Sequence, residues 1–163
     1  MYRYALQIYE KLYEGQDNQN FALAVSNVGT TLIELEEERL NLYHHQQQQA
    51  PAATSLNELV NTSPAFVEGI QLIRLSLSMN QNVYSYICEQ LSGERSPSSS
   101  SNILLRSREE QEEMNDISQE FASCLREAGQ IFSRLGLIDD AVGVLRQQVH
   151  VLTACHEQNE TRK

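Results

Sequence analysis

Hydrophobic residues recur along the first part of this chain three or four residues apart, which is the spacing of an amphipathic α-helix. One helix is predicted in residues 2–14, and its apolar face consists of Ala5, Ile8, Tyr9 and Leu12. After a turn-forming stretch at residues 15–18, a second helix is predicted from about residue 20 to 36. Its expected apolar face is Phe21, Val25, Val28, Leu32 and Leu35. Residues 36–43 are expected to begin a third helix.

The second half of the chain continues the helical pattern. Residues 64–93 have apolar positions at helical spacing, and the polar run at residues 80–82 is expected to divide them into two helices. A long helix is predicted in residues 109–135, and Asp139 opens a last helix with an acidic first turn. The expected apolar face of this last helix is Ala141, Val144, Leu145, Val149 and Leu152. No segment alternates between apolar and polar residues for long enough to predict a strand.

Two segments of low complexity separate these helices. Residues 44–63 are rich in glutamine and alanine, and residues 94–105 are rich in serine. Such compositions lack the apolar residues needed for a packed core, so both segments are predicted to be surface insertions.

Residues 21–35 and 121–135 resemble each other within the chain. The aligned pairs include Phe21 with Phe121, Ala22 with Ala122 and Gly29 with Gly129. A glycine in the middle of a helix costs about 1 kcal/mol relative to alanine, and it is tolerated where another helix crosses closely. Two equivalent glycines therefore indicate two copies of one helix-pair packing, as in repeat proteins.

The series Leu125, Gly129, Phe132, Gly136, Ala141 and Leu145 resembles the tetratricopeptide (TPR) repeat pattern of helix A, turn and helix B. Residues 4–43 are similar to the longer repeats of kinesin light chains. The resemblance implies an all-α solenoid of antiparallel helix pairs, about seven helices in all. It assigns the packing between helices to Gly29, Gly129, Gly136 and Ala141. It also implies a peptide-binding groove, with candidate residues Ser26, Asn27, Thr30, Arg126, Gln130 and Arg134.

Asn27 is the central candidate of that groove, because an amide can both donate to and accept from the backbone of an extended peptide. A solvated helix asparagine is the equally open alternative. The aligned position in the second copy is Glu127, so a uniform row of asparagines is not present.

The expected organisation along the chain follows from these elements. It comprises TPR-like helices in 1–43, the insertion at 44–63, a degenerate helix pair in 64–93, a serine-rich loop at 94–105, a TPR-like helix pair in 106–157 and a tail at 158–163. Because the first helix resembles a helix B without its partner, we expect the chain to belong to a larger chain or complex.

Charge and cysteine content limit the classes of function. The formal net charge is −10 at pH 7. Nucleic acids and anionic membranes attract basic surfaces, so neither is an expected partner, whereas protein partners with basic segments are. The three cysteines are an odd, widely spaced set, which favours free thiols and a reducing, cytoplasmic location.

The residues that could support catalysis or metal binding form no recognisable motif. His44 and His45 are adjacent, and His150 and His156 are six residues apart, so neither pair has the i, i+4 spacing of helical metal ligands. We therefore expect no metal, no cofactor and no enzymatic activity. The expected function is a non-catalytic interaction module that serves as an adaptor or scaffold in a larger complex. Two alternatives are a structural subunit permanently buried in an assembly and a helical-bundle enzyme or metal protein.

Overall fold

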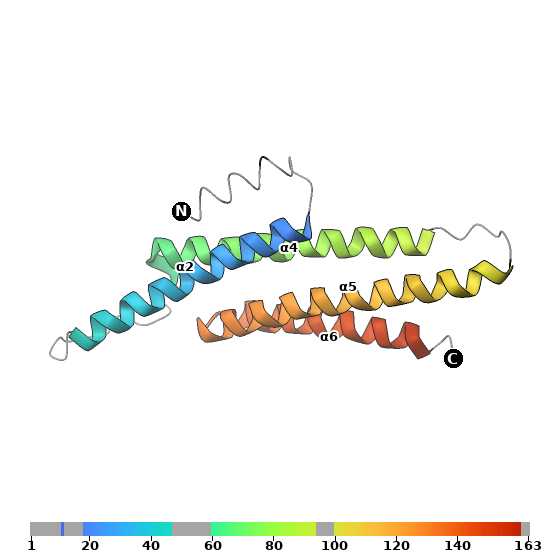
Figure 1. Cartoon of the computed structure of the whole chain (residues 1–163). Helices are drawn as coiled ribbons and strands as arrows, with labels where there is room; N and C mark the ends of the chain where they lie inside the picture. The colour runs from blue at the N-terminus through green and yellow to red at the C-terminus, as the bar shows by residue number, and fades with distance from the viewer. Residues whose placement is uncertain (1–10, 12–17, 47–59, 94–99, 161–163) are drawn as a thin grey trace.

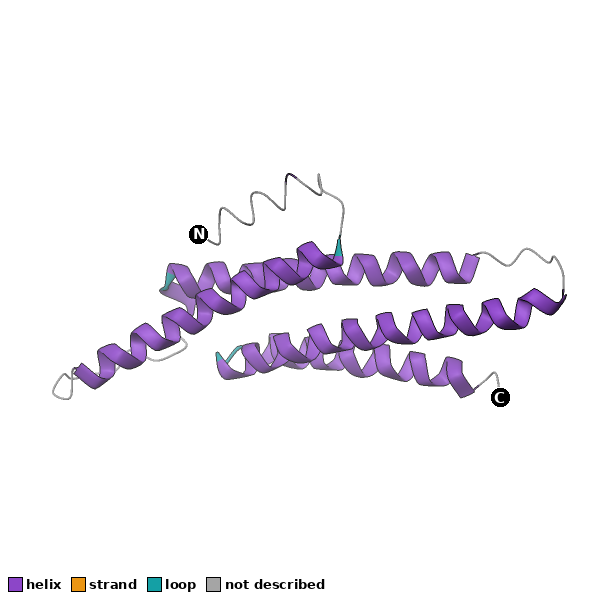
Figure 2. Cartoon of the chain, viewed as in Figure 1, coloured by secondary structure: helices purple, strands orange, loops and turns teal. Residues whose placement is uncertain are grey.

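A computed structural model describes residues 11, 18–46, 60–93 and 100–160 of the chain. The described part is all-α and contains no strand (Figure 2). Its long helices are α2 (Gln19–Gln46), α4 (Pro64–Gly93), α5 (Ser100–Arg134) and α6 (Ile138–Glu160). Figure 1 shows that α2 and α4 run antiparallel as one hairpin, that α5 and α6 form a second hairpin, and that α4 and α5 also pack together.

The first hairpin begins at a capped helix end and contains a close helix crossing. Asn18 caps α2, because its Oδ1 accepts a hydrogen bond from the backbone N–H of Asn20 at 2.8 Å. Further along α2, Gly29 meets Gly69 of α4 so closely that a Cβ on Gly29 would lie 2.8 Å from the Gly69 carbonyl oxygen. The close crossing expected at Gly29 is therefore present, and its second glycine was not anticipated from the sequence.

The second hairpin turns through Gly136. This residue has φ 76°, and it ends α5 as the left-handed residue of a Schellman motif. The N–H of Gly136 donates to Ser133 O at 3.1 Å, and the N–H of Leu137 donates to Phe132 O at 2.8 Å. Gly136 is exposed, so its role is to end the helix and not to pack against a neighbour.

Gly129 lies on α5 and faces α6, where a Cβ would come within 2.9 Å of the Leu145 side chain. Gly29 and Gly129 thus each lie on the first helix of a hairpin and face its second helix. Ala141 is buried in the core beside α5.

The core runs between the two hairpins. The principal cluster consists of Ile33, Val60, Phe66, Ile70, Ile73, Ala128, Phe132, Leu135 and Ala141. A second cluster on the α5–α6 side consists of Phe121, Ala122, Leu125 and Val151, and Tyr84 of α4 stacks on Phe121 with ring centroids 5.1 Å apart.

The expected number of about seven helices is wrong: the described residues form the long helices above and a short helical stretch at residues 60–62. The helix break expected at residues 80–82 does not occur: α4 continues through these residues. Asn80 is buried and its amide donates to Ser76 Oγ at 3.5 Å, while Ser76 Oγ donates to Ala22 O on α2 at 2.7 Å. Asn80 therefore lies on the packed face of α4, whereas the other two residues of the polar run are exposed. A 34-residue TPR repeat holds two short helices, whereas α2, α4, α5 and α6 have 28, 30, 35 and 23 residues.

Several expected boundaries also differ from the structure. Residues 36–46 continue α2 and do not begin a separate helix. Val60, expected in a surface insertion, is 2% exposed and belongs to the principal core cluster. Helix α5 starts inside the expected serine-rich loop, and α6 continues to Glu160, inside the expected tail. The helix expected at residues 2–14 and the remaining parts of both insertions lie almost wholly outside the described residues.

The apolar faces of α2 and α6 differ in detail from those expected. On α2, Leu35 is exposed, while Ile33 is fully buried. On α6, Leu145 and Val149 are exposed, while Val151 and Cys155 are buried. No helix among the described residues is long and apolar enough to cross a membrane.

Candidate functional site

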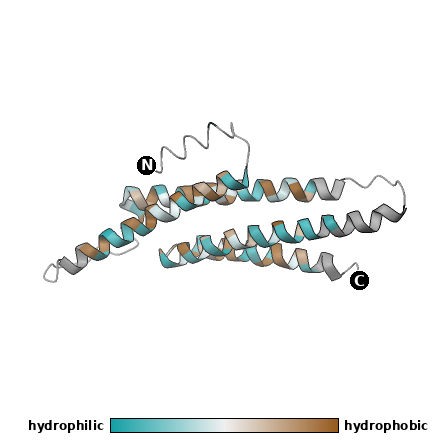
Figure 3. Cartoon of the chain, in the orientation of Figure 1, coloured by the Kyte–Doolittle hydropathy of each residue, from teal (hydrophilic) through white to brown (hydrophobic). Residues whose placement is uncertain are grey.

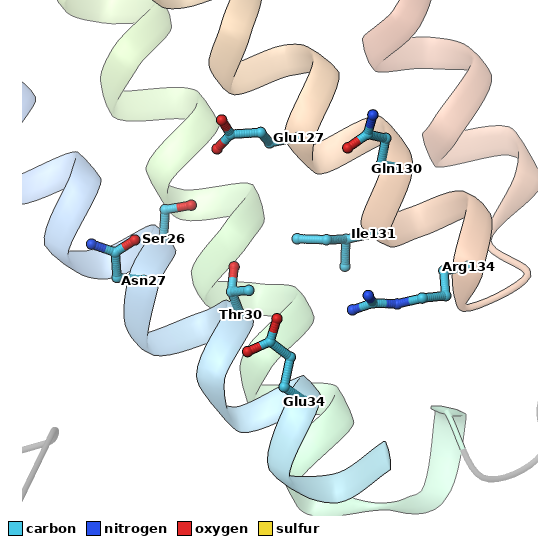
Figure 4. Close-up of a pocket in the computed structure, with 8 residues that line it drawn as sticks. All are labelled: Ser26, Asn27, Thr30, Glu34, Glu127, Gln130, Ile131 and Arg134. Carbon is cyan, nitrogen blue, oxygen red and sulfur yellow. The ribbon is translucent and has the colours of Figure 1, made fainter. Parts of the chain in front are cut away.

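A groove of about 360 Å³ lies between α2 and α5, the first helices of the two hairpins. We call it the α2–α5 groove. It is lined by Ser26, Asn27, Thr30, Glu34, Glu127, Gln130, Ile131 and Arg134. Figure 4 shows that Ser26 and Glu127 lie at one end, Thr30 and Ile131 in the middle, and Glu34 and Arg134 at the other end.

Helical geometry explains why these residues share one surface. Along α5, the lining residues 127, 130, 131 and 134 follow the i, i+3, i+4, i+7 spacing of one helix face. Along α2, residues 26, 30 and 34 repeat every four positions. A neighbouring face of α2, about 100° of rotation away, contains the buried residues Val25, Gly29 and Ile33, so the polar face remains available to the groove.

The groove is polar, and most of its side chains make no hydrogen bond or ion pair with other described residues. Among the described residues, the side chains of Ser26, Asn27 and Thr30 make no hydrogen bond. Ile131 is the single apolar lining residue and is half-buried. An incoming backbone would therefore meet donors and acceptors on the α2 wall and one apolar spot on the α5 wall.

The charges of the groove are unequal. Arg134 Nε forms an ion pair with Glu37 Oε1 of α2 at 3.1 Å, which neutralises the one cation of the lining. Within the described part of the chain, the carboxylates of Glu34 and Glu127 have no ion-pair partner. The net character of the groove is therefore acidic.

The structure brings together five of the six groove residues expected from the sequence: Ser26, Asn27, Thr30, Gln130 and Arg134. Arg126 is not among the lining residues. It lies one residue, about 100° of helix rotation, from Glu127, and its guanidinium donates to Ser123 Oγ at 3.2 Å on the exposed surface of α5.

Three lining residues were not selected from the sequence: Glu34, Glu127 and Ile131. The i+4 spacing from Thr30 pointed to Glu34, and the internal alignment placed Glu127 opposite Asn27.

A buried hydrogen-bonded cluster lies where α2 meets the start of α4. Glu36 is 8% exposed, and its carboxylate accepts hydrogen bonds from Arg39 and from Ser63 Oγ, the latter at 2.7 Å. The hydrogen bonds from Arg39 contribute most to lowering the pKa of Glu36, and the hydrogen bond from Ser63 lowers it further. Burial acts in the opposite direction and only partly offsets them. The cluster joins the two helices of the first hairpin close to the groove.

Two of the described thiols, those of Cys88 and Cys124, are half-buried. Burial raises the pKa of the Cys88 thiol and of the Cys124 thiol, which favours the protonated, unreactive form. Among the described residues, no three histidine, cysteine, aspartate or glutamate side chains are grouped as they would be to hold a metal ion.

Comparison with known proteins gave no relative: no protein-family model, no curated protein and no solved structure matches this chain. The TPR resemblance therefore stays a prediction from sequence.

Proposed function

We propose that this chain is a non-catalytic protein-interaction module whose α2–α5 groove binds an extended segment of a partner protein. The observation that carries the proposal is the convergence, from helices about a hundred residues apart, of unsatisfied polar side chains on one groove. Ser26 and Thr30 supply hydroxyl groups that point toward α5, and Asn27 supplies an amide at the outer edge of the α2 wall (Figure 4). An extended backbone has donors and acceptors at similar intervals.

The proposed segment contains a basic side chain. Glu34 and Glu127 lie on opposite walls without an ion-pair partner among the described residues, whereas Arg134 is paired with Glu37. A lysine or arginine would gain a charge-assisted contact with one of these carboxylates. The net charge of −10 also favours encounter with basic partners.

The size of the groove suits a short segment. A volume of about 360 Å³ is at the lower end of the range for binding pockets in proteins, roughly 300–1,000 Å³. We therefore propose contact with a few consecutive residues, modest affinity and rapid exchange. A reversible adaptor fits this description better than a permanently buried subunit.

We also propose that the two hairpins are elongated relatives of the TPR helix pair, stacked as a short solenoid. Two observations support this relation: the equivalent placement of Gly29 and Gly129, and a groove formed by the first helix of each hairpin. The great length of the helices is the main departure from the TPR pattern.

The test uses an array of 12-residue peptides in which a central lysine, arginine, glutamate or alanine is flanked by randomised positions. The tightest peptide is then titrated by fluorescence anisotropy against the wild type and two groove variants, Asn27→Ala and Glu127→Gln. We expect basic peptides to be selected and Asn27→Ala to weaken binding by about 1–2 kcal/mol, or roughly 5- to 30-fold, because a ligand backbone group loses its partner.

The matched control is Arg126→Ala, which changes the adjacent α5 residue outside the groove and should leave the affinity unchanged. The association rate should decrease as salt increases, since exposed charges steer the encounter. If the array selects no peptide, or if Asn27→Ala and Arg126→Ala bind equally well, the groove does not bind such a segment and the structural-subunit alternative is preferred.

A further inference from the structure

The side of α6 that faces away from α4 carries an apolar stripe. Its members are Ile138, Val142, Leu145 and Val149, whose exposed fractions lie between 39% and 64%. These are four of the nine large hydrophobic side chains that are exposed in the described part of the chain, and they share one helix. Figure 3 shows hydrophobic, brown stretches recurring along α6.

The stripe flanks the face with which α6 packs inside its own chain, and Leu145 borders both, since its side chain also lies against Gly129 of α5. Ala141, Val151 and Cys155 are the buried residues of α6, and they lie on the side toward α5. Helix α6 thus has one apolar face that is covered and a second, flanking one that is not. Exposed apolar patches of this kind commonly mark a contact with another molecule.

The spacing of the stripe identifies the kind of partner it fits. Intervals of four, three and four residues are those of alternating a and d positions in a coiled coil, which pack against another helix. The stripe covers 11 residue steps, so the matching helix would need about 17 Å of contact length.

Two exposed charges on one edge of the stripe make it self-complementary. Asp139 and Arg146 are both exposed and, among the described residues, neither has an ion-pair partner. The neighbouring Asp140 is already bound to Arg74 of α4, at 2.8 and 2.9 Å. Asp139 and Arg146 occupy the same e-type position in successive heptads, and in an antiparallel helix pair these positions face each other.

We propose that α6 packs antiparallel against α6 of a second copy of this chain. With a two-fold axis level with residues 143–144, Val142 lies opposite Leu145 of the second copy and Ile138 lies opposite its Val149. The same axis brings Asp139 near Arg146 of the second copy, and the reciprocal pair forms by symmetry. Such an interface is isologous and therefore closes as a dimer.

The interface is small. A single helix face of this length buries less surface than a standard stable complex, so the dimer should form at micromolar concentrations and dissociate on dilution. The α2–α5 groove belongs to other helices, so dimerisation would present two grooves on one particle and increase the avidity for a multivalent partner.

The test is sedimentation velocity between about 1 and 200 µM, with far-UV circular dichroism to establish that each variant is folded. We expect the wild type to pass from monomer to dimer as its concentration increases. Val149→Ser should stay monomeric, because the substitution removes one apolar side chain from each of the two copies at the interface. The control is Leu75→Ser, which changes an equally exposed apolar residue on α4 and should dimerise like the wild type.

Charge exchange tests the antiparallel arrangement. Asp139→Arg and Arg146→Asp should each weaken dimerisation by about tenfold, because each creates two like-charge contacts. The double variant should return to within about threefold of the wild type, because both pairs are restored with reversed polarity. A wild type that is monomeric at 200 µM, a dimer unaffected by Val149→Ser, or a double variant no better than the single variants would each overturn the proposal.

Discussion

The crossing of Gly29 and Gly69 gives a sharp test of the packing in the first hairpin. The perturbation is Gly29→Ala, which adds one methyl group. That methyl carbon would lie 2.8 Å from the Gly69 carbonyl oxygen and 3.1 Å from both Ile73 Cγ1 and Leu72 Cβ. The first of these neighbours belongs to the backbone of α4 and cannot rotate away, so the helices must move apart.

Two opposing effects determine the magnitude. Overpacking a core usually costs about 1–3 kcal/mol, and a backbone neighbour places this site in the upper half of that range. Alanine regains about 1 kcal/mol of helix propensity relative to glycine. The packing effect dominates, so we expect Gly29→Ala to lower the free energy of unfolding by about 1–2 kcal/mol.

The chain contains a matched control on α6. Gly143 has no heavy atom within 4 Å of an added Cβ, so Gly143→Ala gains helix propensity without a clash. We expect it to stabilise the protein by about 0.5–1 kcal/mol. At Gly129 the obstructing atoms belong to the half-exposed Leu145 side chain, which can move, so Gly129→Ala should fall between the other two variants.

The assay is thermal unfolding followed by circular dichroism at one low protein concentration. Because 1 kcal/mol shifts Tm by about 2–4 °C in a domain of this size, Gly29→Ala and Gly143→Ala should differ by roughly 5–10 °C, with shifts of opposite sign. If Gly29→Ala raised Tm as much as Gly143→Ala, the close crossing would be absent and the argument from equivalent glycines would fail.

Three further predictions concern the cap, the core and pH. Gly136→Ala should destabilise by about 1–2 kcal/mol in urea unfolding, since alanine must adopt the left-handed φ of 76°, and an unchanged midpoint would contradict this role. Val60→Ala should cost about 2 kcal/mol through lost burial, whereas Leu75→Ala on the surface should cost under about 0.5 kcal/mol; equal effects would show that residue 60 is outside the core. The hydrogen bonds from Arg39 and Ser63 lower the pKa of Glu36 below the usual 4.5. The stabilisation from these hydrogen bonds is therefore complete above pH 4.5 and is lost as the pH falls through the lowered pKa. The difference in Tm between the wild type and Glu36→Gln should therefore shrink on acidification from pH 7 to 3, and a constant difference would exclude the carboxylate as its source.

The α2–α5 groove shows which site residues can be predicted from a local sequence pattern. Asn27 could be selected because the resemblance to kinesin-light-chain repeats implies a groove there, and Gln130 because it lies near the aligned position, Glu127, in the second copy. The acidic character of the groove could not be read in the same way, since the sequence has 22 acidic residues and most of them are solvated. Arg134 is neutralised by Glu37, 97 positions away, and only the packing of α5 beside α2 shows this pairing.

The sequence by itself determined the helical class and the close approach at Gly29 and Gly129, because helical periodicity and mid-helix glycines act over one or two turns. Tertiary structure decided which helices pair and where a polar run is tolerated. Asn80 does not break α4: it is buried, and its amide donates to Ser76 Oγ, which itself donates to Ala22 O of α2. Val60 joins the core although it lies in a segment of low complexity, because it packs in one cluster with Ile33 of α2 and Phe66 of α4. The free energy of such contacts comes from residues distant in sequence, so a local sequence pattern cannot predict them.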